Sequence, residues 1–408
     1  MTTMRRTSTT ERSSRDWFRF DVVTESDYHR ELAERRQRGP VQYLAPRPHG
    51  RPVGMYAVYR HGDVARVLRD QSVFTLDVVR DRYGTVLGRR TMISLDSDER
   101  RPYRRLLAGM LGPGRAADLM ARALLPALDE VLDDLAERQM VDLTAAVSSR
   151  LPVLALVRMM GLPSDVTTSL GELSTAIAGF MDRPIPAVRA ARALRGLLAE
   201  PIASRRRRPR SDLISEVVNA EIDGERVTDA EALSLLTLLV WAGTETTGPA
   251  LSNILYALLV HPDQLSRLRD DPGLLPGAIE EGLRWEAPMQ WTCRTVAADT
   301  KVGGTPVPAG SLALAHIGSA NRDEACYVDP GRFDLARSPA DHFAFGYGPH
   351  HCAGSHLGRA ELRVAVSALF DRFPEMALAG ELPVMTGQVV RAPSHLRVRL
   401  GSRQRRGA

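Results

Sequence analysis

The stretch FAFGYGPHHCAG, residues 343–354, holds a single cysteine, Cys352, among three glycines, one proline and two histidines. Gly346 and Gly348 permit a tight turn, and Gly354 lets the backbone approach a large flat group closely. The apolar residues that follow recur at helical spacing, so the cysteine is expected at or just before a helix N-terminus. The positive end of a helix dipole and its free N–H groups stabilise a thiolate, and a thiolate is a metal ligand.

The neighbours of Cys352 narrow the choice of metal. Zinc is disfavoured because no second cysteine lies nearby and His350 is too close for the usual ligand spacing. A catalytic nucleophile needs a base and an orienting partner that the sequence does not identify, and an inert buried thiol is a further alternative. Haem iron needs only one strong protein ligand on its proximal side, and a thiolate is one of the known choices.

This stretch resembles the haem-binding signature F-G-x-G-x-H-x-C-x-G of the cytochrome P-450 family. The matching residues are Phe345, Gly346, Gly348, His350, Cys352 and Gly354. The resemblance implies that Cys352 is the axial iron ligand and that His350 lies near a haem propionate. Phe345, Gly346 and Gly354 would complete the loop that holds haem b. The resemblance covers nearly all of the chain after about residue 17 and implies the family's fold, a triangular, mainly α-helical prism with small β-sheets.

A second motif is EEGLR, residues 280–284, in which Glu281 and Arg284 lie three residues apart and so on one helical face. A pair with this spacing is usually a surface salt bridge. In the cytochrome P-450 family the pair is buried and joined by an arginine from the loop before the cysteine, which implies Arg337 here. The resemblance therefore predicts that these three residues hold the haem-binding core in register, a structural role.

A long helix is predicted between Thr228 and His261, because Thr228 begins a capping box and the sequence His-Pro-Asp ends the pattern. Its centre contains residues that disfavour helix. Pro249 removes the hydrogen bond to the carbonyl of Glu245, and the Thr246 hydroxyl can bond back to the preceding turn. We expect a bend here, which marks either a packing accommodation or a pocket.

The centre of this helix also resembles the A-G-x-[DE]-T motif, which covers the distal face of the haem in the family. The matching residues are Ala242, Gly243, Glu245 and Thr246. Cleaving O2 needs protons, and a hydroxyl and a carboxylate that lead to water form a relay. The resemblance thus implies that Thr246 positions water and that Glu245 is the proton source.

The substrate pocket is expected to be mostly apolar. Its predicted walls are Ala242 and Gly243, the stretch Met289, Gln290 and Trp291, and segments 78–90 and 174–181. Apolar walls with a few polar groups suit a mid-sized organic molecule, without selecting between polyketide, terpene, peptide and aromatic classes.

Arginines are expected to bind the haem propionates. The stretch LDSDERRPYRR, from Leu95, is similar to the start of a helix in the family, with Arg100 at the usual His position and Arg104 at the usual Arg position. Arg294 matches another propionate-binding arginine of the family. Arg100 keeps the positive charge, whereas Pro102, where the family has a helix former, predicts a shifted helix start.

The composition of the 408 residues, 44% hydrophobic and 25% charged with a net charge of +5, is typical of a globular protein. No apolar run approaches the roughly 18 residues of a membrane span, so no membrane association is expected. The run RRRRPR, residues 205–210, is expected to be a solvated loop, because it lacks the interleaved aromatic residues of a nucleic-acid site. No nucleic-acid partner is expected.

The chain is expected to be monomeric, with a disordered leader over residues 1–16 and a single domain over residues 17–408. Three cysteines cannot all pair within one chain, which fits a reducing cytoplasm.

The residues and the resemblance together predict a haem-thiolate monooxygenase that uses O2 to hydroxylate or epoxidise a mid-sized organic substrate in bacterial natural-product biosynthesis. Electrons are expected from NAD(P)H through a ferredoxin reductase and a ferredoxin, with Arg105 and Arg359 steering the acidic ferredoxin. One alternative is a haem-thiolate oxidase that couples rings or desaturates its substrate. Another is a non-catalytic haem-binding sensor or carrier, which the Glu245 and Thr246 pair disfavours.

Overall fold

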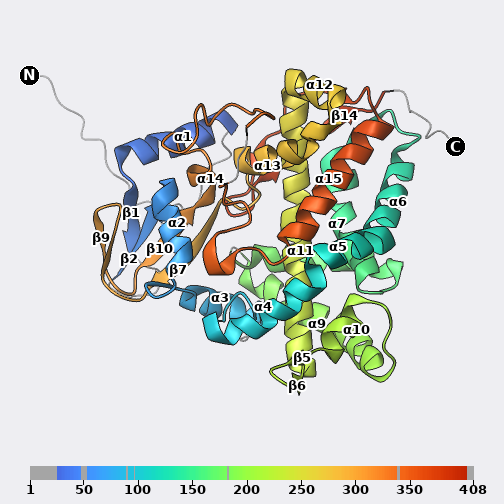
Figure 1. The fold of residues 1–408 in the computed structure, drawn as a ribbon, viewed down its shortest axis with the longest axis horizontal. Coiled ribbons are helices and arrows are strands. Elements are labelled where there is room, and N and C mark those ends of the chain that lie inside the picture. The colour runs from blue at the N-terminus through green and yellow to red at the C-terminus, as the bar shows by residue number, and fades with distance from the viewer. Residues whose placement is uncertain are drawn as a thin grey trace, which may run out of the picture.

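The computed structural model describes residues 25–46, 53–88, 91–95, 97–181, 183–337 and 341–401, and the expected leader lies outside them. Helices dominate the described chain, and the longer strands gather at one side of it (Figure 1). The helices are α1 (Glu25–Arg38), α2 (His61–Arg69), α3 (Asp77–Leu87), α4 (Ser97–Leu111), α5 (Pro113–Leu119), α6 (Leu125–Leu135), α7 (Arg150–Met159), α8 (Thr167–Ala178), α9 (Pro184–Arg207), α10 (Leu213–Asn219), α11 (Asp229–Val260), α12 (Pro262–Asp270), α13 (Leu275–Trp285), α14 (Ile317–Ala320) and α15 (Ser355–Arg372). Shorter helical turns are η2 (Met120–Leu124), η3 (Thr144–Ser148), η4 (Ser164–Val166), η5 (Gly179–Met181), η6 (Pro272–Leu274) and η7 (Gly348–His350).

The strands form one larger sheet and several small ones. They are β1 (Val41–Pro46), β2 (Gly54–Val58), β3 (Phe74–Thr75), β4 (Met140–Asp142), β5 (Glu221–Ile222), β6 (Glu225–Arg226), β7 (Trp291–Val296), β8 (Thr300–Val302), β9 (Thr305–Val307), β10 (Leu312–His316), β11 (Ala377–Leu378), β12 (Met385–Thr386), β13 (Ala392–Pro393) and β14 (Arg397–Arg399). The larger sheet has the order β1-β2-β10-β7-β3, and β2 and β10 run parallel while its other pairs are antiparallel. In its centre Leu314 lies opposite Ala57 on one side and Cys293 on the other. The expected combination of a helical body and small sheets is confirmed.

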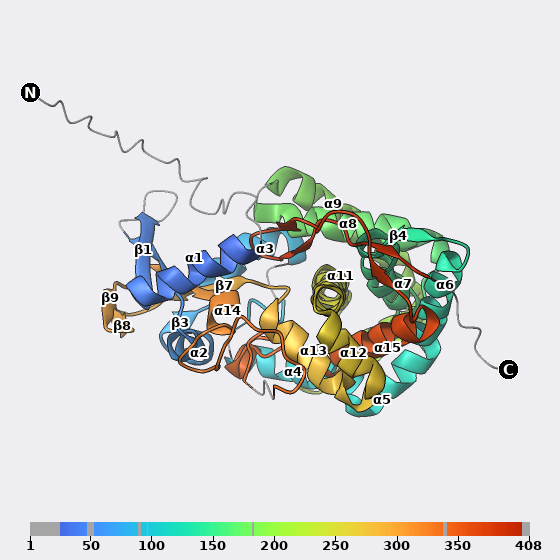
Figure 2. The same cartoon turned by 90° about the horizontal axis from the view of Figure 1, so that it is seen from above.

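Helix α11 runs through the helical body and contacts α7, α8, α9, α13 and α15. Figure 2 shows it end-on, surrounded by other helices. The predicted capping box begins it, with the Thr228 hydroxyl accepting from the Glu231 N–H and the Glu231 carboxylate accepting from the Thr228 N–H. Both predicted limits of the helix are thereby confirmed, since His261 is its C-cap.

The close packing of α11 depends on a glycine. A Cβ atom on Gly248 would lie 2.4 Å from the carbonyl oxygen of Ser148, at the end of η3. The helix continues through Pro249, and the Thr246 hydroxyl donates to the carbonyl oxygen of Ala242 at 2.9 Å, as predicted. The bend at this point stays a prediction.

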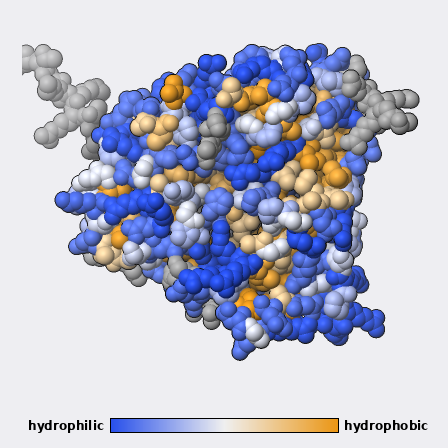
Figure 3. Space-filling view, in the orientation of Figure 1, coloured by the Kyte–Doolittle hydropathy of each residue, from blue (hydrophilic) through white to orange (hydrophobic). Residues whose placement is uncertain are grey.

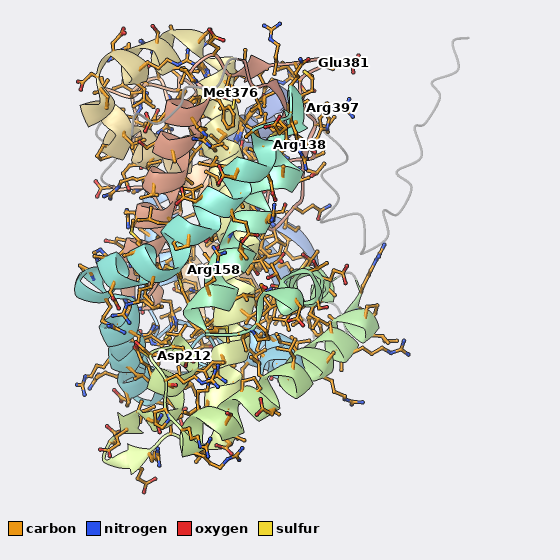
Figure 4. All side chains as sticks on the ribbon, turned by 90° about the vertical axis from the view of Figure 1, so that its right-hand side faces the viewer. Arg138, Arg158, Asp212, Met376, Glu381 and Arg397 are labelled. Atoms are coloured by element: carbon orange, nitrogen blue, oxygen red, sulfur yellow. The ribbon has the colours of Figure 1, made fainter. Side chains whose placement is uncertain are left out.

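The arginine run at residues 205–210 is the expected solvated loop only in its second half, where residues 208–210 follow the helix and are exposed. The first three residues of the run are the last three of α9, which ends at Arg207. The Arg205 side chain is buried, and its Nε atom lies 3.0 Å from Oδ2 of Asp212. Arg205 also donates to the carbonyl oxygen of Gly161 at 2.6 Å. Asp212, labelled in Figure 4, is the N-cap of α10, so the ion pair ties the end of α9 to the start of α10.

The face of the molecule in Figure 3 is mostly hydrophilic, with smaller apolar areas between the polar ones. Among the described residues, no helix combines the length and apolar character that crossing a membrane requires.

Candidate functional site

The loop of Cys352 turns back on itself before α15. Gly346 and Gly348 adopt φ values of 72° and 69°, in the left-handed region that favours glycine. The N–H of Cys352 donates to the carbonyl oxygen of Phe345 at 2.8 Å, and Gly354 is the N-cap of α15. The prediction of a cysteine just before a helix N-terminus is confirmed.

The Cys352 sulfur lies in an electropositive setting inside the fold. Burial raises the pKa of the thiol, whereas the N–H of Gly354 and the guanidinium groups of Arg104 and Arg359 lower it. Although protein surrounds this residue, Cys352 is exposed, so it borders an open space within the fold. A metal cation at the sulfur would favour the thiolate further.

Positive charge converges beside this loop. Arg100 and Arg294 are buried, and together with Arg104 they surround His350, whose pKa is lowered to about 3 by its burial and by these three neighbours. Among the described residues, none of the three arginines has an ion pair with a carboxylate. The Nε atom of Arg100 and the Nε2 atom of His350 are buried without a hydrogen-bond partner.

Those orphaned groups provide a test of whether haem fits. Within the described part of the chain, the buried arginines have no carboxylate to accept their hydrogen bonds. The two propionates of haem are anionic acceptors and would fill this role. The donor set of Cys352, His350, Arg100, Arg104 and Arg294 therefore fits the iron and the propionates of haem.

The backbone also holds part of this cationic group. Arg100 donates to the carbonyl oxygen of Pro349, and Arg104 donates to that of His351 at 2.6 Å. Pro102 lies within α4, which begins at Ser97, and the shift of the helix start relative to the family stays a prediction. Pro102 is the sixth residue of α4, so the amide hydrogen that it lacks would have bonded the carbonyl oxygen of Asp98 inside the helix.

The predicted ion-pair triad is present. Arg284 Nε lies 2.7 Å from Glu281 Oε2, its Nη2 lies 2.8 Å from Glu281 Oε1, and both side chains are fully buried. Arg337 Nε lies 3.2 Å from the same Oε1 atom. Arg284 also donates to the carbonyl oxygens of Asn321 and Pro330, which fixes α13 to the segment that leads toward the cysteine loop.

Helix α11 presents its motif to an open space as well. Ala242 is exposed although most of α11 is buried, and a Cβ atom on Gly243 would meet nothing within 4 Å. Burial raises the pKa of Glu245, while hydrogen bonds from Thr175 and Ser174 oppose that rise. The Thr175 hydroxyl lies 3.0 Å from Oε1 of Glu245.

The two expected pocket residues before β7 differ in position. Met289 is half-buried against the sheet core and forms an isolated bridge with Val390. Gln290 is fully buried, accepts from the Tyr28 hydroxyl at 3.1 Å and donates to Glu286 at 2.9 Å. The expectation that Gln290 lines the pocket is therefore wrong, because its side chain is fully buried, with Oε1 bonded to Tyr28 and Nε2 bonded to Glu286 and to the carbonyl oxygen of Ala287.

An aromatic group of Tyr83, Phe180 and Trp241 was missed by sequence reasoning. The Tyr83 ring centroid lies 5.8 Å from that of Phe180 and 5.5 Å from that of Trp241. The first two residues come from the expected pocket segments 78–90 and 174–181. No local sequence signal shows which of their side chains meet α11, because that depends on how α3, η5 and α11 pack.

The two arginines expected to steer a ferredoxin also differ. Arg105 is exposed on α4. Arg359 instead makes a two-pronged pair with Glu280, at 2.7 and 2.8 Å, and lies over the Phe345 ring at 4.3 Å. Arg359 is thus committed to the support of the cysteine loop.

The mostly helical body combines a cysteine before a helix, an arginine group beside it and an acid–alcohol pair on α11. This combination defines a haem-thiolate protein. The chain matches the family model described as cytochrome P450 over residues 129–272 and 273–397, and it belongs to this family. Membership implies haem, O2 as co-substrate and monooxygenase activity, and confirms the predicted fold and class.

Relatives from bacteria are similar over most of the chain. Identity is 34% over 366 residues with the erythromycin C-12 hydroxylase of Saccharopolyspora erythraea, covering 87% of this chain and 91% of the relative. Identity with the cyclomarin C epoxidase CymV of Salinispora arenicola is 32% over 364 residues, covering 86% of this chain and 90% of the relative. The structure of CxnD, a cytochrome P450 for C–S bond formation in chuangxinmycin biosynthesis, is similar with a TM-score of 0.85 at 29% identity, covering 94% of this chain and 97% of that one.

Proposed function

We propose that this chain hydroxylates or epoxidises a mid-sized organic intermediate of natural-product biosynthesis. The observation that carries the proposal is the combined site, in which Cys352 borders open space and so do Ala242 and Gly243 of α11. The names of the hydroxylase and epoxidase relatives support the reaction type and the biosynthetic setting.

Each group of the site has a distinct role in this proposal. Haem bound here supplies the iron centre at which O2 is activated with two electrons. Cys352 holds the iron as its thiolate, and the arginine group with His350 holds the propionates. Thr246 positions water beside the substrate, and Glu245 gives up a proton and regains one from water.

The aromatic group would form an apolar wall for the substrate, with the Tyr83 ring inclined by 42° to Phe180 and by 39° to Trp241. Tyr83, Phe180 and Trp241 provide large contact area with little side-chain freedom to lose. Apolar walls and few polar groups favour a mid-sized molecule that is mostly hydrocarbon in surface. Glu245 and Thr246 are then not needed for substrate binding and can serve in proton transfer.

Electrons are proposed to come from NAD(P)H through a ferredoxin reductase and an acidic ferredoxin. Exposed Arg105 supports electrostatic steering of such a partner. We also propose a monomer in the cytoplasm, with one catalytic domain over residues 17–408. Three cysteines cannot all pair with one another within one chain, which supports a reducing compartment.

The decisive experiment is a visible-absorption titration of the purified ferric protein with a panel of natural-product intermediates. A ligand that displaces water from the iron changes the spin state and so reveals a substrate. Turnover of that compound should then give a product heavier by one oxygen atom. A protein that lacks a haem absorption band would refute the proposed role of Cys352.

A second candidate is an oxidase that joins two atoms of its substrate, which similarity to CxnD favours. The product would then lack two hydrogens and carry no added oxygen. Replacing Thr246 with alanine separates both enzymes from a haem carrier, because only an enzyme would divert electrons from product to peroxide.

A further inference from the structure

Glu245 on α11 is held by hydroxyl groups of α8 and not by a cation. Thr175 donates to its Oε1 atom at 3.0 Å, and no charged side chain among the described residues contributes to the position of its pKa. Beside it, the Ser174 hydroxyl lies 2.6 Å from the Thr244 hydroxyl, which bonds the carbonyl oxygen of Val240 at 2.9 Å. Two consecutive residues of α8 are therefore bonded to one turn of α11.

We infer that Thr175 is a positioning residue for Glu245. The Thr175 hydroxyl holds the Glu245 carboxyl in place and returns a proton from water to it after each transfer. The inference rests on the proposed role of Glu245 as proton source. It adds a specific partner on a second helix.

The chemistry of a hydroxyl explains why threonine suits this position. A hydroxyl donates to a carboxylate and accepts from a carboxylic acid, so the Thr175 contact persists in both protonation states of Glu245. An arginine partner has no acceptor and would favour the charged form, which cannot give a proton. Glu245 can therefore alternate between acid and base without losing its partner.

Proton balance is simple in this arrangement. Glu245 loses its proton toward the interior, and the Thr175 hydroxyl passes its own proton to the carboxylate while it takes one from water. Thr175 is exposed, so water reaches its oxygen. One proton moves inward in each cycle, and no electron moves with it.

The contact also makes the acid sensitive to the position of α8. Leu170, Ser174 and Ile177 are the buried residues of α8, and Thr175 lies beside this buried face. Separation of α8 from α11 would remove the hydrogen bond and leave Glu245 without a defined orientation. Proton delivery by Glu245 thus depends on the packing of α8 against α11.

Infrared spectroscopy of the haem-loaded ferric protein tests the contact directly, without turnover. Glu245→Gln identifies the carboxyl band by its loss. In Thr175→Val that band should move to higher frequency and its pKa should rise, whereas Thr175→Ser should restore both. Thr168→Val, at an exposed threonine on the same helix, is the matched control. An unchanged band and pKa in Thr175→Val would overturn the inference.

Turnover gives a second readout. Thr175→Val should lower the yield of product per electron roughly fivefold, the factor that one net hydrogen bond supports, and raise the solvent isotope effect. Substrate affinity, read from the spin-state titration, should stay the same. Failure to find any substrate would count against the proposed function alone, because the infrared result stands without it. Thr175→Ala removes the same hydroxyl and serves if the valine variant does not fold.

Discussion

Glu361 lies on α15 with only 7% of its surface exposed, and its Oε1 atom has no hydrogen-bond partner. Burial raises the pKa of this carboxyl from the ordinary value of 4.5 to about 8, and no charged neighbour offsets the change. We predict that Glu361→Gln gains stability relative to the native protein as the pH rises from about 5 to about 8.

The direction follows from the protons bound in each state. The carboxyl of Glu361 ionises near pH 4.5 in the unfolded chain but stays protonated up to about pH 8 in the folded one. Between these values the unfolded state binds fewer protons, so the free energy of unfolding falls as the pH rises. Below pH 4.5 the group has no such effect, and above pH 8 the loss is complete.

The magnitude comes from the gap between the two pKa values. At about 1.4 kcal/mol for each pKa unit, the native protein loses about 2 kcal/mol by pH 6 and about 5 kcal/mol by pH 9. Glutamine does not ionise, so Glu361→Gln should gain about 3 kcal/mol relative to the native protein between these two pH values. Any constant cost of the buried amide cancels in this difference.

Guanidinium unfolding of the haem-loaded protein, followed by circular dichroism at several pH values from 5 to 9, measures the effect. Glu381→Gln, at an exposed position, is the control and should follow the native pH profile. Parallel pH profiles for the native protein and Glu361→Gln would refute the reasoning, because they would mean that water or another group already satisfies the carboxylate.

Four further predictions concern the site and its support. Cys352→Ser should keep its circular dichroism spectrum and lose the absorption spectrum of a thiolate-bound haem after reduction and addition of carbon monoxide. Arg284→Ala should cost about 3–5 kcal/mol, because it leaves a buried carboxylate without its main partner, and should reduce the haem content of the purified protein and its Tm. Gly248→Ala should lower the Tm by the equivalent of about 1–3 kcal/mol, because the new Cβ atom would lie 2.4 Å from a carbonyl oxygen. Gly243→Ala, whose Cβ atom meets nothing within 4 Å, should keep the Tm and change only ligand binding.

Features that depend on near neighbours in the sequence were predicted well. The turn before Cys352 and both ends of α11 follow from glycine, proline and capping residues within a few positions of one another. The pairing of Glu281 with Arg284 follows from helical spacing, but its burial came from the resemblance alone. Sequence spacing brings two charges together without saying how much protein covers them.

Features that depend on distant partners were not predicted. Gln290 faces α1 because Tyr28, from the other end of the chain, donates to it. Arg205, which is buried, donates to the carbonyl oxygen of Gly161, 44 residues earlier in the chain. Arg359 is committed to Glu280 from α13. In each case a polar side chain looked free because its partner becomes a neighbour only after the helices pack.

The central place of α11 has a consequence for the synthesis of the chain. Its apolar faces are covered by α7, α8 and α9, which precede it, and by α13 and α15, which leave the ribosome later. We therefore expect α11 to emerge with part of its surface uncovered until α15 has been made. During that interval the exposed segment is open to aggregation and to chaperones. Haem capture must follow, because Arg100 and Cys352 are supplied by segments made long before and after this helix.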